Sequence, residues 1–164
     1  MEYFTQYISP LGILTLRASK QGLTALSLAQ EAVTGEYLPE HPILQKASSW
    51  LSDYFSGNPR EVDFPLAPEG TAFRQLVWRI LLEIPWGGRC TYGGIAREIE
   101  KRTGKGMSAQ AVGQAVGANP LWIVVPCHRC VGAKGQLTGY AGGMEVKAWL
   151  LRHEGWNISQ NKID

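Results

Sequence analysis

The stretch PCHR at residues 126–129 places a cysteine beside a histidine and an arginine, directly after the apolar residues 123–125. A titratable ring and a fixed positive charge lower the pKa of a neighbouring thiol and make it a nucleophile. Cys127 and His128 therefore indicate nucleophilic chemistry at sulfur. The alternative is a buried structural cysteine beside a chance histidine, since a β-branched run such as 123–125 is typical of a buried strand or core-facing segment.

A carboxylate that could complete such a site lies near the end of the chain. Residues 144–155 carry apolar side chains at helical spacing and close with Glu154 and Gly155, the glycine being a common helix stop. A negative charge at a helix C-terminus is unfavourable, which suggests that Glu154 has a partner elsewhere. With His128 as that partner, Cys127, His128 and Glu154 would form a relay like that of Cys–His hydrolases.

A disulfide framework, a redox pair and a zinc site are weaker explanations of the cysteines. Cys90, Cys127 and Cys130 are too few, and odd in number, for a disulfide framework. Cys127 and Cys130 have redox-pair spacing, but glycines follow them where a thioredoxin-type motif would open a helix. No second pair of Cys or His residues stands at zinc-ligand spacing, so we expect no metal site.

Composition and charge narrow the class of protein. The 164 residues are 45% hydrophobic and 18% charged, which predicts a packed core. No apolar stretch approaches the roughly 18 residues of a membrane span, and the start lacks a secretory signal, so we expect a cytoplasmic protein. Residues 1–70 carry a net charge of −4 and residues 71–164 a net charge of +6. The basic half favours an anionic partner, with nucleic acid the first candidate and a solvated surface the alternative.

The fold class expected is α+β, with a small strand-plus-helix domain over residues 1–68 and a mainly helical domain over 69–164. In the first domain, His41 has no partner nearby and is expected at the surface or as a cap. Alternation and turn residues predict strands at 3–8, 13–18 and 23–28, and helical spacing predicts a helix over 41–55.

The second domain should contain a helix-turn-helix. After a linker at 65–70, Thr71 can cap a helix that runs to Ile84. A short helix over 94–100, a basic turn and a helix over 108–117 capped by Ser108 then follow. The last of these helices has almost no long side chains and contains internal glycines, each of which costs about 1 kcal/mol relative to alanine. Such a helix suits a narrow minor groove better than major-groove readout; the alternative is a tightly packed interior helix.

Five blocks of sequence together resemble the O6-alkylguanine-DNA alkyltransferases, also called methylated-DNA–protein-cysteine methyltransferases. PCHR alone is moderately specific, but all five in this order and at these separations are very specific. Residues 1–68 fit the bacterial two-domain form of that family more loosely. The blocks are TYGGIA at 91–96, AVGQAVGANP at 111–120, PCHR at 126–129, TGYAGG at 138–143 and KAWLLRHEG at 147–155.

The resemblance implies direct-reversal DNA repair. An alkyl group, commonly methyl, would move irreversibly from O6-alkylguanine in duplex DNA to the cysteine, one group per chain. The base would be flipped from the minor groove, because the alkylated oxygen is buried in the stack. The implied partner is double-stranded DNA carrying O6-alkylguanine, with O4-alkylthymine a second candidate lesion. The protein would act as a monomer, without cofactor or membrane.

The resemblance also implies a role for each matched residue. Cys127 would be the thiolate that takes the alkyl group, with His128 its base through a bridging water and Glu154 orienting His128. Tyr92 would help to flip the nucleotide and protonate the leaving guanine, and Asn119 would brace the turn before the cysteine. We expect His128 and a nearby helix N-terminus to raise the ionised fraction of the thiol.

A base pocket and a DNA surface follow from the same resemblance. Arg129 is expected to tie the structure together rather than do chemistry, and is counted with the DNA surface. The pocket residues are Tyr140, Cys130, Trp122, Ala141 and Gly142. The DNA-contacting residues are Ser108, Ala109, Gln110, Ala111, Gly113 and Arg129.

Two positions depart from the family pattern, and three rival functions stay open. Gln110 stands where an arginine usually fills the gap left by the flipped base, and it lacks the charge and stacking plane of guanidinium. Cys130 stands where an aliphatic residue is common; we interpret it as pocket-lining, with a secondary oxidation site the weaker alternative.

A Cys–His hydrolase would release product and react repeatedly, and a helix-turn-helix regulator would bind DNA without Cys127. A non-transferring damage binder commonly replaces the nucleophile by tryptophan, which Cys127 argues against.

Overall fold

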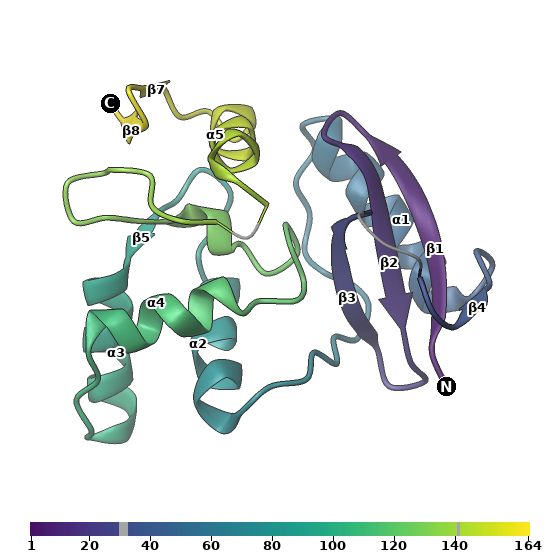
Figure 1. Cartoon of the computed structure of the whole chain (residues 1–164), viewed down its shortest axis with the longest axis horizontal. Coiled ribbons are helices and arrows are strands. Elements are labelled where there is room, and N and C mark those ends of the chain that lie inside the picture. The colour runs from purple at the N-terminus through teal and green to yellow at the C-terminus, as the bar shows by residue number, and fades with distance from the viewer. Residues whose placement is uncertain (30–32, 141) are drawn as a thin grey trace. The chain divides into compact units, whose positions relative to one another are not determined.

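The computed structural model describes residues 1–29, 33–140 and 142–164, which form two compact units (Figure 1). The first unit comprises residues 1–69 and 120–124, and the second comprises residues 70–119 and 125–164. The chain thus returns briefly to the first unit just before the cysteine of PCHR. No pattern in the sequence indicated this return.

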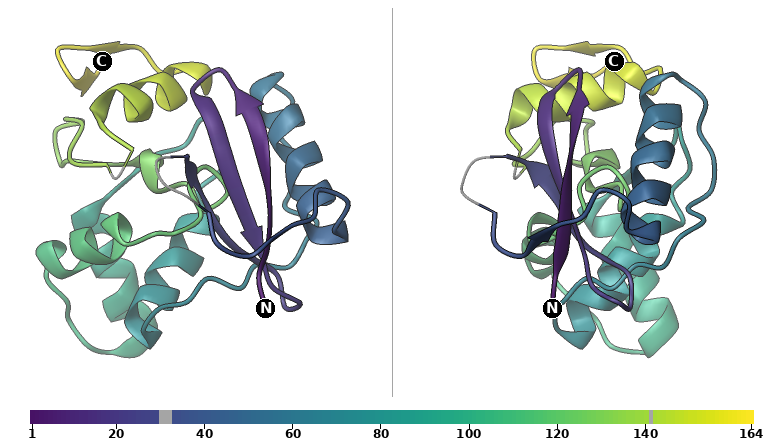
Figure 2. Two further views of the ribbon diagram at one scale, coloured as in Figure 1. Left: turned by 45° about the vertical axis from the view of Figure 1, so that its right-hand side comes forward. Right: turned by 90° about the vertical axis from the view of Figure 1, so that its right-hand side faces the viewer.

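The first unit is a sheet with the strand order β3-β2-β1-β4, covered on one face by a helix (Figure 2). The three predicted strands are confirmed as an antiparallel meander, whereas β4, which runs parallel to β1, was not anticipated. The helix begins after His41, whose Nδ1 accepts a hydrogen bond from the Ile43 amide at 3.3 Å, so the cap interpretation is confirmed. The elements are β1 (Tyr3–Ser9), β2 (Gly12–Ala18), β3 (Leu23–Leu28), β4 (Glu36–Tyr37) and α1 (Pro42–Phe55).

Residues 120–124 join this unit through backbone hydrogen bonds to β3. The Leu26 amide donates to the Pro120 carbonyl at 2.8 Å, and the Trp122 amide donates to the Leu26 carbonyl at 3.1 Å. Residues 123–125 are buried, as predicted. They form a turn that faces the core and not a strand. Ile123 has a φ of 71°, a region that β-branched residues rarely adopt.

The second unit contains the predicted helices, with α4 running across α2 and α3 (Figure 1). Thr71 and Ser108 are N-caps, as expected, and Thr91 is a third. The hydroxyl of Thr91 accepts from the Gly94 amide at 2.9 Å, so α3 starts before its glycines and is longer than the predicted 94–100. The helices are α2 (Ala72–Leu82), α3 (Tyr92–Thr103), α4 (Ala109–Gly117) and α5 (Met144–His153).

Short elements connect these helices to the cysteine. A 3-10 turn, η1 (Cys127–Arg129), leads into β6 (Cys130–Val131), which pairs in parallel with β5 (Cys90–Thr91). A terminal hairpin of β7 (Ile158–Ser159) and β8 (Lys162–Ile163) shares an apolar cluster with α5. No helix within the described residues is long and apolar enough to cross a membrane.

Candidate active site

Cys127 stands at the start of η1, where a buried asparagine holds the incoming chain. The side-chain amide of Asn119 donates to the Val125 carbonyl at 2.9 Å, and the Cys127 amide donates to the same carbonyl at 2.8 Å. Asn119 is only 4% exposed. A hydrogen bond of Asn119 therefore fixes the turn between α4 and the cysteine. The family resemblance implied this bracing role for Asn119.

The predicted partner of Glu154 is present. His128 Nε2 lies 2.6 Å from Glu154 Oε2, and Arg129 Nε donates to Glu154 Oε1 at 2.7 Å. Arg129 also donates from Nη2 to Glu154 Oε2 at 3.1 Å and from Nη1 to the Ile84 carbonyl at 2.5 Å. All three charged or titratable side chains are buried. The cluster thus ties η1 to the end of α5 and to the chain just beyond α2.

The charges in this cluster are set by burial. Burial lowers the pKa of His128, although Glu154 opposes the shift, so the ring is neutral at rest. Burial also acts against ionisation of Glu154, but hydrogen bonds from His128 and Arg129 and the charge of Arg129 outweigh it and hold the pKa of Glu154 well below its usual range. Because His128 is neutral, Arg129 is the positive partner of Glu154. Among the described residues, His128 Nδ1 has no hydrogen-bond partner, which leaves that ring atom available as a base.

The resting sulfur is a thiol, which corrects the expectation of a raised thiolate fraction. Cys127 is 5% exposed, and burial raises its pKa. Hydrogen bonds from Asn119 and Tyr140 and the charge of Lys147 act in the opposite direction without overcoming burial. A neutral His128 supplies no positive charge, and η1 is only a three-residue turn. Ionisation of Cys127 must therefore be coupled to the reaction itself.

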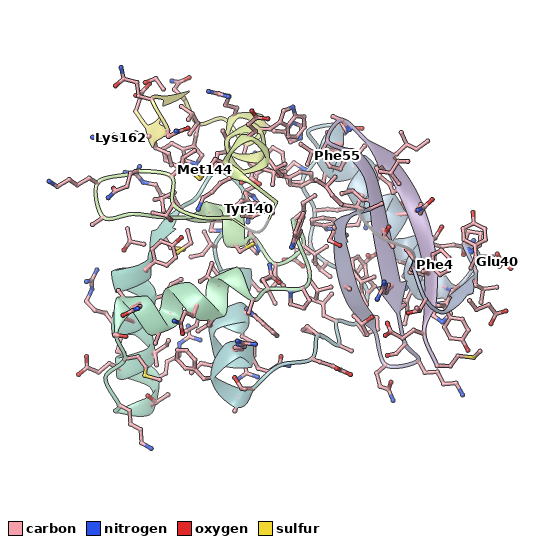
Figure 3. All side chains as sticks on the ribbon, viewed as in Figure 1. Phe4, Glu40, Phe55, Tyr140, Met144 and Lys162 are labelled. Carbon is pink, nitrogen blue, oxygen red and sulfur yellow. The ribbon has the colours of Figure 1, made fainter. Side chains whose placement is uncertain are left out.

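A small pocket reaches Cys127 between the end of α4 and the loop before α5. Its volume is about 10 Å³, room for about one water molecule, so a base cannot enter unless the pocket opens. Figure 3 shows Tyr140 in the loop that leads to Met144 at the start of α5. The lining residues are Val116, Gly117, Asn119, Cys127, Gly139 and Tyr140.

Among the described residues, Cys130, Trp122 and Gly142 do not line this pocket. Cys130 is fully buried in β6 opposite Cys90, so the pocket-lining interpretation of its side chain is wrong. Trp122 belongs to the first unit. Gly142 is half-buried and follows the pocket loop, and Ala141 is outside the described residues.

Tyr92 is the first residue of α3, and its hydroxyl forms a short hydrogen bond with the Thr138 hydroxyl. Burial raises the pKa of Tyr92 to about 12, so the phenol keeps its proton at neutral pH. Its ring lies under α4, where a Cβ at Gly113 would meet it at 3.7 Å. Tyr92 can therefore both donate a proton and support α4.

Lys147 is a site residue that the sequence analysis missed. It is fully buried in α5, and its Nζ donates to the Cys130 carbonyl at 2.6 Å. Burial lowers its pKa, while its charge lowers the pKa of Cys127. A lysine in an amphipathic helix is usually exposed, but Lys147 shares a helical face with Leu150, Leu151 and Glu154. That spacing was the available signal.

One face of α4 is exposed and carries mostly small residues. Val112, Ala115 and Val116 are buried, and Trp78 Nε1 donates to the Ala115 carbonyl at 2.9 Å. Outside α4 and its chain neighbours, no atom of the described residues lies within 4 Å of where a Cβ at Gly117 would stand, so their packing does not require that glycine. This observation disfavours the interior-helix alternative for the outer face. That face exposes Ser108, Ala109, Gln110, Gln114 and Gly117, with Ala111 and Gly113 half-buried.

Arg129 does not belong to this surface. The residue is 8% exposed, and its guanidinium is bonded to Glu154 and the Ile84 carbonyl. A DNA contact would require these bonds to break, so the assignment of Arg129 to the DNA-contacting set is corrected to a structural role.

Comparison with known proteins agrees with the motifs. Residues 72–156 match the 6-O-methylguanine DNA methyltransferase, DNA binding domain, and residues 3–68 match the 6-O-methylguanine DNA methyltransferase, ribonuclease-like domain. The chain therefore belongs to the 6-O-methylguanine DNA methyltransferase family. Its enzyme class is methylated-DNA–protein-cysteine methyltransferase, as the resemblance implied, and its family repairs DNA by methyl transfer to cysteine.

Individual relatives of this family cover nearly the whole chain. The methylated-DNA–protein-cysteine methyltransferase of Methanosarcina acetivorans is 40% identical over 157 residues, covering 93% of this chain and 98% of the relative. That of Haemophilus influenzae is 38% identical, covering 93% and 86%. The structure of Mycobacterium tuberculosis OGT in complex with DNA is 41% identical with a TM-score of 0.81, covering 93% and 92%.

We predict that His128 makes stability depend on pH. The folded pKa of His128 lies below its ordinary value near 6.5, so its contribution is present above that pH and is lost as the pH falls and the unfolded chain takes up a proton. The free energy of unfolding should fall by up to about 1.4 kcal/mol per pH unit below pH 6.5. Urea unfolding of His128→Gln should show a flatter dependence, with His153→Gln as control. Parallel profiles for His128→Gln and the native protein would contradict the burial argument.

We predict that Lys147→Met shifts methyl transfer to higher pH, because it removes the positive charge that opposes burial of the thiolate. The rate at neutral pH should fall on the order of tenfold, the effect of about one pKa unit. The pH profile of the single-turnover rate measures the shift, and Lys162→Met, an exposed lysine in β8, is the control. A slower rate with an unmoved profile would indicate a structural role only.

Proposed function

We propose that this protein removes an alkyl group from O6 of guanine in duplex DNA by irreversible, stoichiometric transfer to Cys127. One observation carries the proposal: Cys127 lines a pocket, and the two residues that follow it, His128 and Arg129, are bound to Glu154 in a buried cluster. The same cluster could serve a hydrolase, but family membership favours alkyl transfer.

The proposed reaction is an in-line displacement at carbon. The Cys127 proton passes through a bridging water to His128 Nδ1, and Glu154 stabilises the imidazolium that forms. A sulfur–carbon bond forms as the bond between carbon and the guanine oxygen breaks. The leaving guanine takes a proton from Tyr92, which regains one from His128, so the thiol proton ends on the base.

The fate of the product follows from its chemistry. A thioether is not hydrolysed under physiological conditions, and the cluster around Cys127 contains no group that could cleave it. Each chain is therefore consumed by one alkyl group, and no soluble donor is required.

We propose that α4 enters the minor groove with its outer face. Small residues let the helix backbone approach sugars and phosphates, and Val116 and Gly117 at its end also line the pocket. The lesion is extruded toward Cys127, at an unstacking cost of a few kcal/mol. Gln110, exposed in the first turn of α4, fills the gap by hydrogen bonding to the orphaned base.

We predict that Cys127→Ala abolishes transfer but spares binding to alkylated duplex, because α4 does not use the thiol. Intact-mass measurement after incubation with an O6-methylguanine duplex should show a gain of one methylene on the native chain and none on the variant. Cys90→Ala is the matched control and should still gain it. Repeated turnover would instead support a hydrolase, and retained transfer by Cys127→Ala would refute the assignment.

We predict that Gln110→Arg tightens duplex binding, because guanidinium adds charge and a stacking plane. Affinity should rise most at low salt and converge at high salt, as expected for an added positive charge near phosphates. Fluorescence anisotropy at several salt concentrations measures this, with Gln75→Arg in α2 as a control outside α4. Equal affinities for the native chain and Gln110→Arg at every salt concentration would argue against Gln110 facing DNA.

We predict opposite effects of Gly117→Ala on stability and on binding. The substitution should stabilise the fold by up to about 1 kcal/mol, because alanine favours helix and none of the described residues obstructs the new methyl group. It should weaken duplex binding by obstructing close approach. Thermal unfolding and anisotropy together test this, and a variant that is more stable and binds DNA unchanged would remove Gly117 from the interface.

A further inference from the structure

Cys90 and Cys130 form a thiol pair that the methyl transfer does not use. They are directly opposite one another in the parallel strands β5 and β6, and both are free thiols. The side chains of opposed residues point to the same face of a sheet, and neighbouring strands lie about 4.8 Å apart. That spacing falls within the roughly 4.4–6.8 Å between Cα atoms that a disulfide bridges. The register therefore allows a cross-link with little backbone movement, and the two thiols interact closely enough to shift each other's pKa.

The two thiols differ in a way that suits sequential oxidation. Cys90 is partly exposed, whereas Cys130 is fully buried. Contact with Cys130 and the charges of Lys147 and Arg129 lower the pKa of Cys90 against the effect of burial, and contact with Cys90 raises the pKa of Cys130. An accessible, acidic thiol beside a second thiol is the arrangement of a sensing and a resolving cysteine.

We propose that Cys90 and Cys130 form a reversible disulfide in response to a peroxide, while Cys127 keeps its thiol for the alkyl group. The Cys90 thiolate attacks one peroxide oxygen, the O–O bond breaks, and the sulfenic acid and hydroxide form. The Cys130 sulfur then attacks the sulfenic sulfur, the S–S bond forms, and the S–O bond breaks. The hydroxide released in each step takes a thiol proton, so hydrogen peroxide is reduced to two waters and two thiols are oxidised by two electrons.

The geometry favours this pair over Cys127 and Cys130. Cys127 lies at the far end of η1, and its thiol faces the pocket beside Asn119 and Tyr140. Cys127 is also buried, and burial raises its pKa, which slows attack on peroxide. The disulfide would link the strand before Tyr92 to the strand after η1 without consuming the nucleophile.

Peptide mapping of the full chain after treatment with hydrogen peroxide tests the proposal. The expected product has lost two hydrogens and contains one cross-linked peptide joining Cys90 to Cys130. Iodoacetamide should still label Cys127 after denaturation, and a dithiol reductant should restore the starting mass. A cross-link through Cys127, sulfinic acid without a cross-link, or no oxidation at peroxide concentrations that oxidise free cysteine would each overturn it.

Two variants separate the steps. Cys130→Val should stop at the sulfenic acid of Cys90, which dimedone traps, and Cys90→Ala should leave Cys130 reduced because it has no exposed surface. Dimedone labelling confined to Cys127 in Cys130→Val would contradict the assigned order. The mapping does not depend on alkyl transfer, so its failure would leave the proposed function unaffected.

Discussion

Burial of charge around His128 is the constraint on which the rest of the structure depends. Glu154 and Arg129 are held almost without solvent, and Lys147 is fully buried against the Cys130 carbonyl. Removing one partner from a buried ion pair costs about 3–5 kcal/mol, a large share of the roughly 5–15 kcal/mol that stabilises a typical protein. Because Arg129 also bonds the Ile84 carbonyl, this cluster joins α5, η1 and the chain beyond α2. The site and the fold of the second unit therefore depend on the same contacts.

The same burial keeps Cys127, the proposed nucleophile, protonated at rest. With His128 neutral and Cys127 protonated, no reactive thiolate is present to take part in side reactions. The narrow pocket also limits the access of small electrophiles to Cys127. Activation then requires something that opens the pocket. The end of α4 forms part of the pocket wall, while its outer face is the proposed DNA surface. Docking of DNA and opening of the pocket would thus act through one helix.

Local patterns in the sequence predicted much of this arrangement. Alternating apolar residues predicted the three long strands, and helical spacing with capping residues predicted α1, α2 and α4. The unfavourable charge of Glu154 at a helix end predicted that it has a partner elsewhere, which is His128. The misses all depend on tertiary contacts. Strands of two residues such as β4, β5 and β6 carry no periodicity, and the return of residues 120–124 to the first unit leaves no local signal. The burial of Lys147 had a signal in its helical spacing, but lysines in amphipathic helices are usually exposed. The resting thiol was missed because neighbouring residue types suggested a lowered pKa, whereas burial dominates.

The protonation state of His128 tests the central claim most directly. Nitrogen-15 NMR of the folded protein at neutral pH distinguishes imidazolium from the two neutral tautomers. The account predicts a neutral ring whose Nε2 carries the proton and donates it toward Glu154, with Nδ1 unprotonated on the side of Cys127. An imidazolium at neutral pH, or a proton on Nδ1, would contradict it, because His128 could then not accept the thiol proton.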